Sequence, residues 1–166
     1  MTFSFVHLAV GSGLIALLVI LFSIGNFPRQ RVFGYYQNFL SWLSGRKNEM
    51  SYLGWFDKKT PRLYTLADLI QTKTKPAECV FVYGDEPNFY PLAQRCPATF
   101  VVAAYHLEFG PGFRNKALAQ LIASPPRFII TIKNTPAPFD DLFKFLKINY
   151  RTWVTLEDAT IWQRIG

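Results

Sequence analysis

The loop after the first predicted strand carries the densest set of polar side chains that could bind a ligand. It reads GDEPN at residues 84–88 and holds Asp85, Glu86 and Asn88. In open α/β sheets ligands bind beyond the carboxyl ends of strands, where this loop is expected. Adjacent carboxylates would repel a phosphate, and neither GxGxxG nor a P-loop is present. We predict a candidate ligand or partner loop. The alternative is a strand-ending turn whose acidic residues favour a helix amino terminus.

His106 is the histidine that could join this loop, because the other one, His7, lies in an apolar amino-terminal stretch. An imidazole beside Glu108 could bind a ligand or move a proton, although a loop histidine can also be merely solvated. One histidine and two cysteines make no recognisable zinc spacing, and no serine lies in a nucleophile motif. The sequence therefore assigns no catalytic residue, no metal ligand and no cofactor.

Cys79 and Cys96 are the only cysteines, separated by 17 positions. One begins the first predicted strand and the other precedes the second. Equivalent ends of adjacent parallel strands lie close together, so a disulfide is feasible in an oxidising compartment. Two buried free thiols are the alternative.

Composition excludes a disordered or fibrous chain. The 166 residues are 50% hydrophobic, 17% aromatic and 17% charged, with a net charge of +7. Residues 25–78 hold nine basic and four acidic side chains, whereas residues 79–166 hold nine and seven. The basic surplus therefore lies close to the apolar stretch, which favours attraction to anionic membrane lipids. No nucleic-acid-binding motif is present, and we predict no such partner.

Residues 3–24 contain no Lys, Arg, Asp or Glu. A bilayer core needs about 20 apolar residues as a helix, so we predict a transmembrane helix within residues 1–26. A signal peptide is the alternative, but a basic amino end and a small-residue cleavage site are both missing. Arg29 and Arg31 follow the apolar stretch, and the positive-inside rule alone would place the rest of the chain in the cytoplasm.

Residues 27–64 are predicted to be a juxtamembrane segment. A helical period places apolar residues on one face between positions 27 and 48. They are Val32, Phe33, Tyr36, Phe39, Leu40 and Leu43. Aromatic side chains favour the membrane interface, so we predict a helix lying on the membrane surface. A helix packed on the following domain is the alternative, and residues 49–64 are expected to be a connecting loop.

Residues 65–166 show the alternation of an α/β domain. Strands are predicted at 79–83, 99–103 and 127–132, with helices near 66–70, 87–95, 117–122 and 139–146. Two final strands, 150–156 and 159–164, are separated by a turn at Glu157 and Asp158. This order favours a small three-layer domain: a mainly parallel sheet between helices, with an antiparallel carboxyl-terminal hairpin.

From Leu66 onward the chain resembles a known family. The features that carry the resemblance are Tyr83-Gly84-Asp85 at a strand end, Phe89-Tyr90 leading to Arg95 and Pro97, and Pro125-Pro126-Arg127 entering a strand. They resemble the carboxyl-terminal extracytoplasmic domain of GT-C type membrane glycosyltransferases that use polyprenyl-phosphate sugars. These multi-span enzymes are related to protein O-mannosyltransferases and to the lipid A aminoarabinose transferase. The apolar helix would correspond to the family's last transmembrane helix.

The resemblance implies sugar transfer from a lipid-phosphate carrier, with catalytic carboxylates in a loop between earlier membrane helices. Only two residues precede the apolar stretch here. We therefore expect a truncated or split, non-catalytic module that packs on a multi-span transferase portion or shapes acceptor access. The family places this domain outside the cytoplasm, periplasmic or on the outer face, and we prefer that placement to the charge rule. The alternative is a stand-alone membrane-anchored α/β domain that binds another membrane protein or protein partner.

Overall fold

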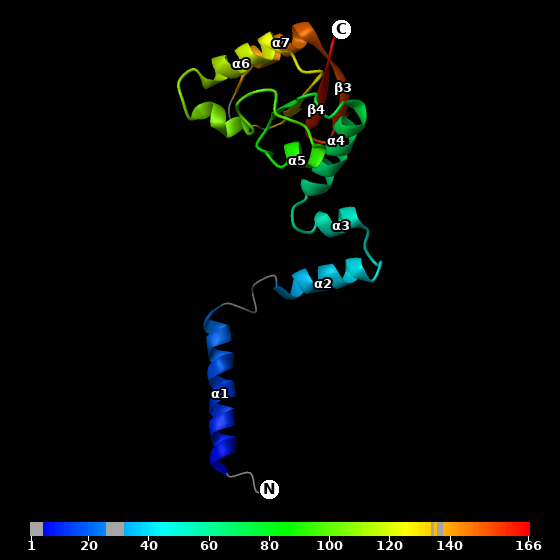
Figure 1. Cartoon of the computed structure of the whole chain (residues 1–166). Coiled ribbons are helices and arrows are strands. Elements are labelled where there is room, and N and C mark those ends of the chain that lie inside the picture. The colour runs from blue at the N-terminus through cyan, green and yellow to red at the C-terminus, as the bar shows by residue number, and fades with distance from the viewer. Residues whose placement is uncertain (1–4, 26–31, 134, 136–137) are drawn as a thin grey trace. The chain divides into compact units, whose positions relative to one another are not determined.

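The computed structural model describes residues 5–25, 32–133, 135 and 138–166 (Figure 1). The first two residues of the predicted apolar span, and residues 27–31 of the predicted juxtamembrane segment with Arg29 and Arg31, lie outside the described residues. The chain divides into two compact units, Met1–Trp55 and Phe56–Gly166. Each unit is considered by itself.

The first unit consists of helices α1 (Phe5–Ile24), α2 (Val32–Leu43) and α3 (Glu49–Leu53). Helix α1 covers most of the charge-free stretch, and its large apolar side chains from Val10 to Ile24 are exposed, each by about half or more. Among the described residues, no helix has both the length and the hydropathy needed to cross a membrane.

Helices α2 and α3 pack against each other through the polar edge of α2. Asn38 is buried; its side chain donates to the Tyr52 carbonyl at 3.2 Å and accepts from Lys47 Nζ at 2.9 Å. The ring of Trp42 stacks on that of Tyr52 at 5.1 Å. Most of the predicted apolar face is left open: Phe33, Tyr36, Leu40 and Leu43 are exposed. The prediction that residues 49–64 form only a loop was wrong, because α3 and the first turn of the next helix lie there.

The second unit is built on a four-stranded sheet in the order β1-β2-β4-β3. The strands are β1 (Phe81–Tyr83), β2 (Phe128–Ile132), β3 (Tyr150–Leu156) and β4 (Ala159–Arg164). β1 pairs parallel with β2, and β4 pairs antiparallel with both β2 and β3. An α/β fold with a carboxyl-terminal hairpin is therefore confirmed. A mainly parallel sheet is not, because the hairpin inserts β4 beside β2 and leaves one parallel pair.

The strand predicted at 99–103 is missing from this sheet. Its Thr and Val content is typical of strands, but the Thr99 hydroxyl donates to the Val101 carbonyl at 3.1 Å, and the segment folds on itself. Such local side-chain bonds compete with strand pairing. Just before it, Pro97 forms an isolated parallel bridge with Val80 at the start of β1.

Helices cover both faces of the sheet because strand residues alternate between the faces. Val80 and Val82 face one core, which includes residues of α4 (Thr60–Lys73) and α5 (Phe89–Ala93). Phe81 and Tyr83 face the other core, which includes residues of η2 (Ala104–Glu108), α6 (Phe113–Ala123) and α7 (Asp140–Asn149). Both cores are rich in fully buried Leu, Ile and Phe, so each face of the sheet is stabilised by apolar burial.

Two buried tyrosines hold the ends of this arrangement. β1 is an edge strand, and its Val82 N–H donates to the Tyr90 hydroxyl at 3.1 Å. The Tyr150 hydroxyl donates to the Pro126 carbonyl at 2.7 Å. Burial is the main cause that raises the pKa of each phenol to about 12, because desolvation disfavours the phenolate.

The domain should therefore lose stability in alkali. Between pH 10 and 12 the unfolded tyrosines lose protons that the folded ones retain, so the free energy of unfolding falls as pH rises. We expect the free energy of unfolding to fall by about 1.4 kcal/mol per pH unit for each tyrosine between pH 10 and 12. Below pH 10 each tyrosine makes its full contribution to stability. Urea unfolding from pH 8 to 11 measures it. Tyr90→Phe should lower stability at pH 8 and decline less steeply above pH 10; a decline as steep as in the parent would contradict this assignment.

Candidate functional site

The loop at the carboxyl end of β1 is tied to the segment that carries His106. The Gly84 carbonyl accepts from Ala104 N–H, and Asp85 Oδ1 accepts from Tyr105 N–H, both at 2.9 Å. Glycine is favoured at position 84, since a Cβ there would overlap Ile132 Cγ1 and lie 3.0 Å from the Cβ of Ile132. The Asp85 carboxylate thus orders the start of η2, which is a structural role.

His106 lies among aromatic rings and not among carboxylates. Its ring is 4.2 Å from that of Tyr105 and 5.4 Å from that of Phe109, centroid to centroid. Tyr105 and Phe109 are exposed, Phe109 by 71%. The nearby Glu108 pairs with Arg114. His106 is half-buried in an aromatic cluster with the exposed Tyr105 and Phe109, and its part in a ligand or partner loop stays a prediction.

The Glu86 carboxylate forms an ion pair that the sequence alone does not predict. Its carboxylate pairs with the guanidinium of Arg62, which also pairs with Asp158 in the turn between β3 and β4. The Arg62 side chain is fully buried, and that of Glu86 is 12% exposed. Arg62 lies on the same helical face as the buried Leu66 and Ile70, a spacing that could have identified it had α4 been predicted to begin before Thr65.

Asn88 is exposed and marks the start of α5, but its side chain forms no capping hydrogen bond. With Asp57, Lys59, Asp85 and Glu86 it borders a shallow cavity of about 220 Å³. The predicted loop residues Asp85, Glu86 and Asn88 therefore do line one hollow. Both carboxylates of this set, however, already bind protein groups: Asp85 binds Tyr105 N–H and Glu86 binds Arg62.

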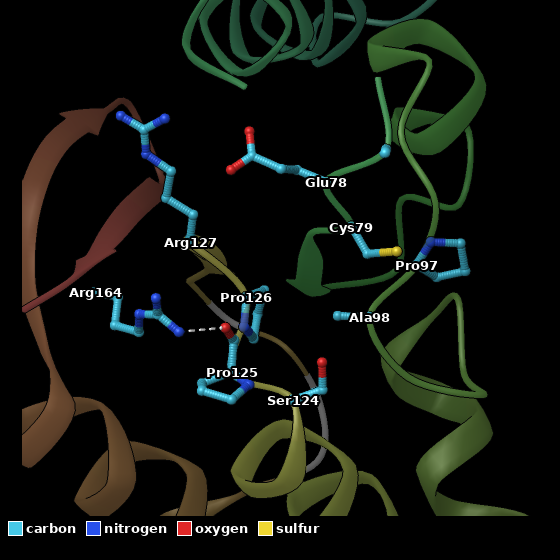
Figure 2. Close-up of a pocket in the computed structure, with 10 residues that line it drawn as sticks. Glu78, Cys79, Pro97, Ala98, Ser124, Pro125, Pro126, Arg127 and Arg164 are labelled. Carbon is cyan, nitrogen blue, oxygen red and sulfur yellow. Dashed lines mark hydrogen bonds between the residues drawn. The ribbon is translucent and has the colours of Figure 1, made fainter. Parts of the chain in front are cut away.

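A second pocket, of about 350 Å³, lies at the opposite end of the strands (Figure 2). Parallel strands β1 and β2 begin at this edge, and β4, being antiparallel to β2, ends there. The topology therefore gathers Cys79 before β1, Arg127 before β2 and Arg164 at the end of β4. The remaining lining residues are Ala77, Glu78, Pro97, Ala98, Ser124, Pro125 and Pro126.

The charged side chains of this pocket have few protein partners. Arg164 Nη1 donates to the Pro125 carbonyl at 3.0 Å, and the Arg127 guanidinium lies 5.3 Å from the centroid of the Phe128 ring. Among the described residues neither arginine pairs with a carboxylate. Glu78 Oε2 accepts from Lys75 N–H at 2.5 Å. In the sequence, Pro125-Pro126-Arg127 is informative only through its resemblance to the glycosyltransferase domain. The proximity of Arg127 to Arg164 follows from the strand order, which the sequence does not reveal.

One wall of the pocket is fixed by a disulfide between Cys79 and Cys96, whose Cα atoms are 4.5 Å apart. Adjacent backbone bonds reinforce it: Val80 N–H donates to the Cys96 carbonyl at 2.9 Å, and Ala98 N–H donates to the Val80 carbonyl at 2.8 Å. The bridge therefore closes the chain segment that contains α5.

Loss of this disulfide should destabilise the domain markedly. A loop of this size gives about 3 kcal/mol through restriction of the unfolded chain. We expect Cys79→Ser/Cys96→Ser to lose that amount in urea unfolding. The parent with reductant should match the variant without it, since both lack the bridge. Stability of the parent unchanged by complete reduction would contradict the prediction.

Within the described ranges, no three His, Cys, Asp or Glu residues come together in a group that could hold a metal ion. Comparison of the chain with protein-family models, with curated proteins and with solved structures finds no match to any of the three.

Proposed function

We propose that this chain is a membrane-anchored, non-catalytic module whose α/β domain works outside the cytoplasm. The disulfide between Cys79 and Cys96 carries the proposal. Structural disulfides persist in the periplasm and on cell surfaces, whereas cytoplasmic thiols are kept reduced. The bridge joins the start of edge strand β1 to the segment of Pro97 and Ala98, which lines the pocket of Figure 2, so the fold is suited to an oxidising compartment.

The first unit supports attachment to a membrane. Residues 3–24 carry no charge, and the exposed apolar side chains of α1, such as Leu14, Ile15 and Val19, would be covered by lipid. Leaving them in water would be unfavourable, since each large apolar side chain gains roughly 1.5–3 kcal/mol on burial.

The open face of α2 fits the membrane interface. Phe33, Tyr36, Leu40 and Leu43 are exposed on one side, while Asn38 and Trp42 on the other side contact α3 or the residues that flank it. Aromatic side chains next to a basic segment favour the boundary between lipid headgroups and acyl chains. Arg46 and Lys47 supply that charge immediately after the helix. The exposed aromatic face and the basic segment together support lipid as the cover of the open face.

The resemblance to GT-C type glycosyltransferases suggests which larger assembly the module serves. The residues that carry it have identifiable roles in this fold: Gly84 allows close contact with Ile132, the Tyr90 hydroxyl accepts from β1, and Arg95 binds helix-end carbonyls. These roles are structural and not catalytic, in keeping with a non-catalytic module. We propose that the module packs on a multi-span transferase portion, or shapes acceptor access to it, while sugar transfer from the lipid-phosphate carrier takes place in that portion.

Turnover tests the non-catalytic part of the proposal. The purified 166-residue chain in nonionic detergent is incubated with polyprenyl-phosphate sugars and candidate acceptors, alone and with a multi-span transferase from the same cells. We expect no transfer by the chain alone and a change in acceptor use only when both are present. Sustained turnover by the chain alone would refute a non-catalytic role.

The alternative is a stand-alone anchored domain that binds a protein partner. It is favoured by the aromatic cluster of Tyr105, His106 and Phe109, in which Tyr105 and Phe109 are exposed. Exposed aromatic side chains are common at protein interfaces. Photo-crosslinking from position 109 and from position 33 in living cells separates the two ideas. Crosslinks to lipid from position 33, together with crosslinks to a transferase from other positions, support the transferase module. Capture of a single unrelated protein from position 109 supports the stand-alone domain.

A further inference from the structure

The pocket at the amino ends of β1 and β2 has a charge pattern that the proposed function does not use. Two guanidiniums, from Arg127 and Arg164, and one carboxylate, from Glu78, border a cavity of about 350 Å³ (Figure 2). Two positive charges against one negative charge leave a surplus of one positive charge. The volume lies at the lower end of the range for sites that bind small molecules.

The arginines retain most of their hydrogen-bonding capacity. A guanidinium has five N–H donors in a planar fork. Arg164 uses one of its nitrogens on the Pro125 carbonyl, which holds the side chain at the pocket, and no described residue accepts a hydrogen bond from the side chain of Arg127. The exposed Ser124 adds a hydroxyl to the same lining. Planar forks with free donors match the oxygens of carboxylate and phosphate groups.

The walls of this pocket are held in place before any ligand arrives. Pro97, Pro125 and Pro126 have restricted backbones, and the disulfide at Cys79 joins the first of them to the start of β1. The Glu78 carboxylate is fixed by its bond to the Lys75 N–H. A preorganised wall lowers the entropic cost of binding. Glu78 would also oppose a highly charged anion, which selects for a ligand of low net charge.

We propose that this pocket binds a small ligand through one anionic group, a carboxylate or a phosphate monoester, held between Arg127 and Arg164. Ser124 donates to the same group, and Glu78 limits the negative charge that the pocket accepts. The site lies at the opposite end of the strands from the loop of Asp85 and Glu86.

Titration of the full chain in nonionic detergent micelles tests the site. The side-chain Nε–Hε signals of the arginines are followed by NMR while acetate, inorganic phosphate or a short-chain phosphatidic acid is added at constant ionic strength. Arg127→Gln and Arg164→Gln should each weaken binding at least tenfold, and Glu78→Gln should strengthen it severalfold. Arg151→Gln is the matched control. It removes the same charge, and Arg151 is exposed on the outer strand β3.

Saturable shifts of the Arg127 and Arg164 signals in the parent chain, which persist in Arg151→Gln, support the site. In each pocket variant the shift of the remaining arginine should disappear. The anion that binds most tightly identifies the ligand group. Tightest binding of acetate indicates a carboxylate, and tightest binding of inorganic phosphate indicates a free phosphate. Tightest binding of phosphatidic acid indicates a lipid headgroup. No saturable shift with any of the three, or equal weakening by Arg151→Gln, would overturn the proposal. Because the Arg127 side chain donates to no described residue, loss of fold in Arg164→Gln would still leave Arg127→Gln as a valid test.

Discussion

Replacement of Arg95 by alanine should cost the α/β domain about 3–5 kcal/mol of unfolding free energy, a large share of the stability of an ordinary domain. Arg95 is 7% exposed, and its guanidinium forms five hydrogen bonds. Its acceptors are the Thr74 hydroxyl and the carbonyls of Gln71, Thr74, Ala93 and Gln94. Two of these carbonyls end α4 and two lie at the end of α5. Alanine would leave a cavity and buried carbonyls without donors.

The conservative variant separates geometry from charge. Arg95→Lys keeps the positive charge but has a single nitrogen, which cannot reach acceptors on both helices, so we expect about 2 kcal/mol to remain lost. Arg151→Ala, at an exposed position, should change stability by less than about 0.5 kcal/mol. Urea unfolding followed by circular dichroism measures all three. A loss below 1 kcal/mol for Arg95→Ala would show that this network does not hold α4 and α5 together.

Arg62→Met should be similarly damaging, at about 3–5 kcal/mol, because it leaves a nearly buried carboxylate without its partner. The Arg62 side chain is 0% exposed and pairs with Glu86 and Asp158, joining α4 to the loop after β1 and to the β3–β4 turn. The cluster is also incompletely satisfied, since Arg62 Nε and Glu86 Oε2 are buried without a hydrogen-bond partner among the described residues.

A second substitution should therefore rescue the first. In Arg62→Met/Glu86→Gln the stranded charge is removed, and we expect at least half of the lost stability to return, a clear departure from additivity. The exposed pair Lys144 and Asp141 is the matched control, and Lys144→Met should cost less than about 0.5 kcal/mol. Thermal or urea unfolding of Arg62→Met, Glu86→Gln, the double variant and Lys144→Met decides this. Additive losses in the double variant would contradict the view that an unpaired Glu86 causes the damage.

The sequence predicts the elements of this domain better than their arrangement. Strand 150–156, strand 159–164 and the turn between them follow from alternating aromatic and polar residues, and the structure has them at the same bounds. The apolar run before Lys133 likewise gives β2. Strand order could not be predicted, because pairing of β4 with β2 depends on side chains brought together from distant positions, such as Trp162 Nε1 donating to Thr131 Oγ1 at 2.9 Å.

The candidate site was harder to predict, for a physical reason. Sequence patterns reveal which residues are polar but not which polar groups satisfy one another. The sequence leaves Glu86 as a candidate ligand group, whereas in the fold it pairs with Arg62, 24 positions earlier. No sequence pattern links Arg127 with Arg164, and only the strand directions place both at one pocket. Cys79 and Cys96 left two alternatives open, and the structure joins them in a disulfide.

The most direct test of an extracytoplasmic, disulfide-locked domain is the redox state of Cys79 and Cys96 in living cells. Cells that produce the full chain are quenched with acid, denatured and treated with a maleimide polymer that adds mass to each free thiol; Cys79→Ser provides the one-thiol marker. Our account predicts no mass shift without reductant, a two-thiol shift after reductant, and a chain that stays with the membrane fraction after an alkaline wash. A two-thiol shift without reductant would contradict it.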